Sequence, residues 1–193
     1  MEEKTSAPSD QEAALMVRAK AMHASALTLD AHADIEIPGK PSSYVGSDGL
    51  SKVAPQKMRT GGLDAVVMAI AVGPMPRNTE GYAAAKAIAQ TKLEAVKALA
   101  DDKNNNRTIT LNANELITAH NEGKSALILG FQNALILGTE LGGINTLFNS
   151  GVRVFALTHM GHNDFADSSR TLFNGETGTR EPDAEHGGLS ALG

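Results

Sequence analysis

The chain has 193 residues, of which 41% are hydrophobic and only 4% aromatic. This length and apolar content suffice for one domain with an aliphatic core. The formal net charge of -5 gives no reason to expect a nucleic acid or an anionic membrane as a partner. The absence of cysteine excludes disulfides and thiolate metal sites, so any metal would need His, Asp, Glu, amide or water ligands.

Residues 1–9 are polar and are predicted to be a disordered lead-in, with no apolar core of a signal peptide. Asp10 is expected to cap a helix that runs to about Ser25. The short apolar run at 26–30 is predicted to be a strand, and the sequence His-Ala-Asp follows it at 32–34.

Residues 38–62 are rich in Gly, Ser and Pro and are predicted to form a long loop. The run at 65–72 is apolar at every position, which is typical of a strand covered on both faces. An Ala-rich stretch at 79–100 predicts a long helix.

The rest of the chain continues this alternation. The expected elements are a short extended piece at 108–111, a helix that begins at Asn112 or Asn114 and ends near Gly123, a strand at 125–131, a helix at 139–150 and a strand at 152–158. Residues 160–193 show no periodicity and exceed the ~12–15 residues of an ordinary loop, so a functional lid, a disordered segment or both are expected. Four strands separated by helices predict a parallel α/β sheet, either doubly wound or part of a barrel.

No apolar stretch reaches the ~18–20 residues of a membrane-spanning helix, so we expect a soluble protein with no transmembrane segment. It would be periplasmic or extracellular if a signal peptide was removed, and cytoplasmic otherwise. The sequence does not separate these compartments.

Polar side chains of ligand type follow three of the predicted strands. His32 and Asp34 follow the first strand, Gln132 follows the third and His159 follows the fourth. The carboxyl ends of parallel strands share one edge of a sheet, where α/β proteins build their sites. These residues are therefore candidates for one functional site.

The His-x-Asp spacing has its own physical logic. Residues two apart in an extended chain point the same way, so His32 and Asp34 could reach one cation. Imidazole nitrogen and carboxylate oxygen suit zinc and similar divalent ions. The alternative is a surface loop in which Asp34 caps a turn, but the equivalent placement of His159 on another strand favours a metal site.

Other catalytic patterns are absent from the sequence. There is no Gly-x-Ser-x-Gly elbow for a nucleophilic triad. There is also no P-loop and no dinucleotide-binding fingerprint after a strand.

Several segments together resemble the membrane (renal) dipeptidase family of zinc metallopeptidases. The matching segments, in the family's order, are 29–34, 61–65, 125–133, 151–159, 165–167 and 188–193. The resemblance runs from about residue 26 to the end of the chain. It implies a TIM-type (β/α)8 barrel of the metal-dependent hydrolases, with about the first four β/α units, its N-terminal half, in residues 10–193.

The resemblance also implies a function. Members hydrolyse the peptide bond of dipeptides with two zinc ions, through a metal-bound hydroxide, because zinc lowers the pKa of bound water and polarises the carbonyl. His32 and Asp34 match the ligands of one zinc ion. His159 matches the residue that contacts substrate and helps to stabilise the tetrahedral intermediate.

Two features depart from the family pattern. Gln132 occupies the position of the glutamate that bridges the two metals, and a neutral amide offers one good oxygen and no charge. One zinc ion is therefore expected, with a weaker second one. The chain also ends before the family's remaining ligands, and half a barrel would leave bare sheet edges, so the remainder is expected from a partner chain or a second copy, or is missing.

Three other interpretations stay open at this point. The chain could belong to a metal-dependent hydrolase of other amides or lactams. It could be a truncated, non-catalytic fragment that acts as a binding or assembly module. It could also be a small doubly wound binding domain, although the patternless residues 160–193 would add nothing to such a sheet.

Overall fold

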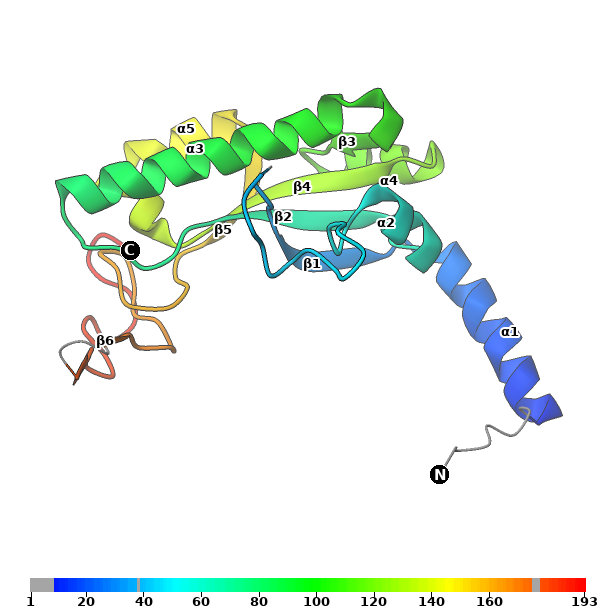
Figure 1. Cartoon of the computed structure of the whole chain (residues 1–193), viewed down its shortest axis with the longest axis horizontal. Helices are drawn as coiled ribbons and strands as arrows, with labels where there is room; N and C mark the ends of the chain where they lie inside the picture. The colour runs from blue at the N-terminus through cyan, green and yellow to red at the C-terminus, as the bar shows by residue number, and fades with distance from the viewer. Residues whose placement is uncertain (1–8, 38, 175–177) are drawn as a thin grey trace.

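The computed structural model describes residues 9–37, 39–174 and 178–193, so most of the predicted lead-in at 1–9 lies outside the described residues. A five-stranded parallel sheet forms its centre (Figure 1). The strands run in the order β1 (Leu29–Asp34), β2 (Ala65–Ala71), β4 (Ser125–Gln132) and β3 (Arg107–Ile109), and β5 (Val152–Ala156) also pairs with β4. β3 pairs with the start of β4 and β5 with its end.

Helices connect these strands. They are α1 (Asp10–Ser25), α2 (Pro55–Gly61), α3 (Thr79–Asp101), α4 (Ala113–Asn121) and α5 (Gly142–Asn149), with short 3-10 helices at Lys103–Asn105 and Ala134–Leu137. A two-residue antiparallel pair, β6 (Phe173–Asn174) and β7 (Thr179–Arg180), lies in the C-terminal segment. Parallel strands joined by helices confirm the predicted α/β class.

One face of the sheet packs against α3, which lies along the strands in Figure 1. The buried side chains of this layer are Val66, Met68, Ile70, Val72, Leu127, Leu129 and Phe131 from the sheet and Ala85, Ala89, Leu93 and Val96 from α3. The phenyl rings of Phe131 and Phe155 meet edge to face, with their centroids 4.9 Å apart. All seven residues of β2 are buried, as predicted for a strand covered on both faces.

The opposite face carries smaller side chains. The register aligns Ala69 of β2 with Gly130 of β4. A Cβ atom on Gly130 would come within 3.1 Å of Val67 Cγ1, so the strands leave little room there for a larger residue. In (β/α) barrels the helices cover the outside of the sheet. Apart from the contact of α4 with Ala65 and Ala126, this face is the one that would line the interior if the sheet closed into such a barrel.

The predicted start of α1 differs by one residue. Ser9, rather than Asp10, is the N-cap, because its side chain accepts from the Glu12 backbone N–H while Glu12 bonds back to the Ser9 N–H. No residue of α1 is buried, and the helix extends away from the sheet (Figure 1). None of the helices within the described ranges has the length and apolarity needed to cross a bilayer.

The first strand lies further along the chain than predicted. It begins at Leu29 and includes His32 and Asp34, because pairing with β2 continues until Asp34 lies beside Ala69. The segment 38–62, predicted to be a loop, contains α2. This helix begins with Pro55, and Gly62, in the left-handed conformation (φ 64°), caps its C-terminal end. Proline at the start and glycine after the end are local helix signals, whereas seven residues are too few to show a periodic pattern.

The helix predicted at 139–150 is shorter than expected. Only α5 (Gly142–Asn149) lies within it, and a separate 3-10 helix, Ala134–Leu137, precedes α5 and is followed by Gly138 at φ 65°. No regular structure was predicted for residues 160–193. Among the described residues of this segment, the only strands are β6 and β7.

Candidate functional site

His32 and Asp34 are brought together at the end of β1. His32 Nε2 lies 3.9 Å from Asp34 Oδ2, and the side chain of His32 is 47% exposed while that of Asp34 is 14% exposed. Two ligands of a tetrahedral zinc ion with bonds of about 2.1 Å lie about 3.4 Å apart. A small rotation of the exposed imidazole would close this difference, so the pair fits two ligands of one ion.

The local backbone supports this pair. The pairing register of β1 with β2 shifts between Asp30 and Ala33, and Asp30 Oδ1 accepts a hydrogen bond from the His32 N–H at 3.0 Å. This hydrogen bond stabilises the backbone of β1 at the register shift, where His32 lies. Asp30 thus supports the backbone of His32 from outside the candidate ligand pair.

The register also places Gln132 on the same face of the sheet as Asp34. Asp34 lies beside Ala69, and Gln132 lies beside Ala71. Side chains two residues apart on a strand share a face, so Asp34 and Gln132 both project toward the side of the sheet away from α3. They are two strands apart, roughly 10 Å across the sheet.

His159 follows β5, where the chain leaves the sheet. Its Nδ1 atom is buried and finds no hydrogen-bond partner in the described part of the chain, while its carbonyl oxygen accepts from the Ser168 hydroxyl. Among the residues that the structure describes, no three His, Asp or Glu side chains gather closely enough to hold one metal ion. The structure therefore does not join His159 to His32 and Asp34 in a ligand group.

Two residues near Asp34 were not anticipated from the sequence. Asp34 raises the pKa of Tyr44, because its carboxylate favours the protonated hydroxyl and its charge opposes ionisation. Lys92 of α3 donates to the Ala71 carbonyl oxygen at 2.7 Å. Burial lowers the pKa of Lys92, and the charge of Asp34 opposes this effect. Neither residue carries a local signal, since Tyr44 lies in an irregular segment and Lys92 in an ordinary helix.

The other histidines of the C-terminal segment have structural roles. His162 is buried. Its Nδ1 accepts from the Ser168 N–H at 3.0 Å, and its Nε2 donates to the Pro182 carbonyl oxygen at 2.8 Å. His186 Nε2 donates to the carbonyl oxygen of Asn163 at 2.9 Å. Both rings are therefore engaged in holding this segment together.

The chemistry of the donor set is that of a divalent metal site. One imidazole and one carboxylate can bind a zinc-like ion, and the amide oxygen of Gln132 is a weaker, uncharged donor. A complete site needs at least one more strong ligand, which the described residues do not bring to the pair.

Known proteins resemble this chain in sequence and in fold. The profile of a family described as membrane dipeptidase (peptidase family M19) matches residues 16–193. No curated protein matches the chain. The crystal structure of the probable dipeptidase PvdM from Pseudomonas aeruginosa superposes with a TM-score of 0.79 at 26% identity, over 93% of this chain and 45% of that one.

Two further solved structures share the fold. The dipeptidase AC, a metallopeptidase of family M19, has a TM-score of 0.63 at 18% identity, over 86% of this chain and 50% of that one. A metallopeptidase from Rhodobacter sphaeroides, liganded with a phosphinate mimic of the dipeptide L-Ala-D-Ala, has a TM-score of 0.58 at 17% identity, over 71% of this chain and 43% of that one. The chain thus spans about half the length of the structures that it matches.

Proposed function

Because the chain belongs to the membrane dipeptidase family (peptidase family M19), we propose that it contributes its five-stranded parallel sheet and the first metal ligands to a zinc-dependent dipeptidase barrel. The observation that carries this proposal is the pair of His32 and Asp34, with Nε2 and Oδ2 3.9 Å apart at the end of β1. Family membership implies a metal cofactor, and imidazole with carboxylate favours zinc.

Each candidate residue has a distinct role in this proposal. His32 and Asp34 would hold one zinc ion, and Gln132, on the same face as Asp34, would offer at most a weak bridge to a second. A bound zinc ion supplies activation of water and polarisation of the scissile carbonyl. His159 would contact substrate and help to stabilise the tetrahedral intermediate.

The proposed substrate class is a dipeptide. The family description supports this choice, and so does the Rhodobacter sphaeroides neighbour, whose ligand is a mimic of L-Ala-D-Ala.

Metal content tests the first part of the proposal. We expect elemental analysis of the purified chain to find about one tightly held zinc ion. His32→Ala and Asp34→Asn should each weaken zinc binding by at least about tenfold, since even changes outside the ligand set cost that much in metal sites. His23→Gln, at an exposed position on α1, is the matched control. Equal zinc affinity in all three variants would contradict the assignment.

Activity tests the second part. The zinc-loaded chain is assayed for amine release from dipeptides, N-acyl amino acids and lactams, with His159→Ala as the catalytic variant. Hydrolysis restricted to dipeptides supports the proposal. Preferential hydrolysis of lactams or N-acyl amino acids would contradict it and would indicate a metal-dependent hydrolase of other amides. A chain that binds zinc but cleaves none of these compounds would instead be a binding or assembly module.

A further inference from the structure

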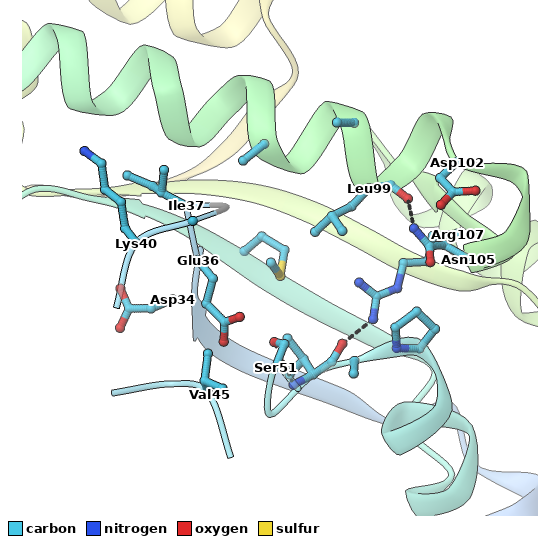
Figure 2. A pocket seen from close by; sticks show the side chains of 17 residues that line it. Asp34, Glu36, Ile37, Lys40, Val45, Ser51, Leu99, Asp102, Asn105 and Arg107 are labelled. Carbon is cyan, nitrogen blue, oxygen red and sulfur yellow. Dashed lines mark hydrogen bonds between the residues drawn. The ribbon is translucent and has the colours of Figure 1, made fainter. Parts of the chain in front are cut away.

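A cavity of about 390 Å³ lies between α3 and the chain that follows β1, on the opposite side of the sheet from the face that carries Gln132 (Figure 2). We propose that this cavity binds a zwitterion with an apolar body, the chemistry shared by a free aliphatic amino acid and a dipeptide of such residues. The residues that carry the argument are Glu36, Ile37, Val45, Leu99 and Arg107.

Arg107 provides the positive charge. It is only 7% exposed, and its Nη2 donates to the Val53 carbonyl oxygen and lies 3.3 Å from Met58 Sδ. Its Nε atom is buried without a hydrogen-bond partner, and no acidic side chain in the described ranges forms an ion pair with it. Burial, with a smaller effect of Arg59, lowers the pKa of Arg107 to about 10, so the guanidinium stays charged at neutral pH.

Glu36 provides the negative charge from the other end of the cavity. Its Oε1 atom is buried and has no hydrogen-bond partner among the residues described. Figure 2 shows Glu36 and Arg107 reaching into the cavity from different elements, the chain after β1 and the start of β3. The structure thus places a half-buried carboxylate and a buried guanidinium in one cavity without pairing them.

This arrangement selects a ligand with two opposite charges. An uncompensated buried charge is costly, so a ligand that brings an ammonium group to Glu36 and a carboxylate to Arg107 removes both costs. A diamine would pair only with Glu36, and a dicarboxylate would pair only with Arg107. The apolar walls formed by Ile37, Val45 and Leu99 can cover an aliphatic body, and the volume lies within the range of small-molecule sites.

The cavity adjoins the proposed catalytic face at Asp34 and is otherwise lined by different residues. Its lining includes Met68 and Leu99, which belong to the layer between the sheet and α3. Of the four candidate site residues, only Asp34 is part of its wall. The inference goes beyond the proposed dipeptidase activity and does not depend on it.

Equilibrium dialysis of radiolabelled L-leucine against the metal-free chain tests the proposal, because chelation removes binding through zinc. We expect saturable binding of leucine, competition by L-leucyl-L-leucine, and at least about tenfold weaker competition by leucinamide and by 4-methylpentanoate, which each lack one charge. The order of affinity of leucine and the dipeptide identifies the natural source of the ligand. Competition by leucinamide or 4-methylpentanoate as strong as by leucine would overturn the proposal, as would no binding of leucine or the dipeptide at millimolar concentration.

Variants locate the binding. Glu36→Gln keeps the shape of the side chain and should weaken leucine binding by at least about tenfold, as should Arg107→Lys. Glu94→Gln, the same chemical change at an exposed position of α3, should leave binding unchanged, and so should His32→Ala. The thermal unfolding midpoint of each variant shows that it is folded. Equal binding by Glu36→Gln and Glu94→Gln, or loss of binding in His32→Ala, would rule out this cavity.

Discussion

Asn163, buried in the C-terminal segment, donates a hydrogen bond from Nδ2 to Oδ1 of Asn133, directly after β4, at 3.0 Å. Asn133 has a positive φ of 81°, and its Oδ1 also accepts from the Leu135 N–H. Asn163 Oδ1 accepts in turn from the N–H groups of Phe165 and Ala166. The two amides therefore fasten residues 160–168 onto the end of the sheet.

Asn163→Ala should loosen this connection. The substitution leaves two buried N–H groups without their acceptor, and we expect a loss of about 3 kcal/mol in the free energy of unfolding. Urea denaturation measures this loss, and limited proteolysis should show earlier cleavage within 160–193. Asn114→Ala, at an exposed position of α4, is the control and should change neither the free energy of unfolding nor the proteolytic cleavage pattern. An unchanged cleavage pattern in Asn163→Ala would show that other contacts hold the segment.

Tyr82 should titrate at unusually high pH. Burial raises its pKa to about 12, assisted by its hydrogen bond to Asp164 and by the charge of that carboxylate. The Tyr82 hydroxyl lies 2.8 Å from Asp164 Oδ2. Because the folded-state pKa is raised, the stability contributed by Tyr82 is present below pH 10.0 and is lost as the pH rises toward about 12.

Ultraviolet absorbance of the phenolate measures this titration cleanly, since the chain has two tyrosines and no tryptophan. We expect Tyr82→Phe to remove a transition near pH 12 and Asp164→Asn to move it toward 10.0. The transition that remains belongs to Tyr44. If wild-type and Tyr82→Phe chains gave the same titration above pH 10.0, the contact with Asp164 would not persist in solution.

Asp167 should contribute stability that depends on pH. Burial acts to raise its pKa, but the N–H groups of Gly188, Glu185 and His186 lower it to about 2, and His162 adds a smaller effect when its ring is protonated. The sign follows from the lowered pKa: the stabilisation is complete above 3.8 and disappears as the pH falls through about 2.

Asp167→Asn tests this dependence. The variant should unfold at a lower temperature than wild type at neutral pH, and the difference should shrink between pH 3.8 and about 2. Asp183→Asn, at an exposed position in the same segment, is the control. A difference between wild type and Asp167→Asn that stays constant with pH would attribute the effect to lost packing rather than to charge.

Gln132→Glu should increase the capacity of the chain for metal. A carboxylate offers two anionic oxygens on the face that also carries Asp34, whereas the amide offers one neutral oxygen. We expect zinc titration to show a second binding event, or an affinity increase of at least about tenfold, in Gln132→Glu. Gln90→Glu, at an exposed position of α3, controls for the added charge. Identical titrations of the two variants would remove residue 132 from the metal site.

The sequence predicted the elements with strong local signals. β2 is apolar at every position, and α3 is long and rich in alanine, so both were located within about two residues of their observed ends. α2 was missed because seven residues are too few for a periodic pattern. The extent of β1 was wrong because its later residues, including His32 and Asp34, are extended by pairing with β2 rather than by their own propensity.

The candidate site also combines features that the sequence predicted with features that depend on the tertiary structure. The His-x-Asp spacing and the order of motifs are local information, and they were sufficient to identify the family, the parallel α/β fold and the side chains to test. Only the tertiary structure decided that Asp34 and Gln132 share a face of the sheet. It also decided that Asp34 affects the pKa values of Tyr44 and Lys92, and that the charged groups of Glu36 and Arg107 are left unpaired. Strand register and burial bring together residues that are far apart in the chain, and neither is encoded in any single segment.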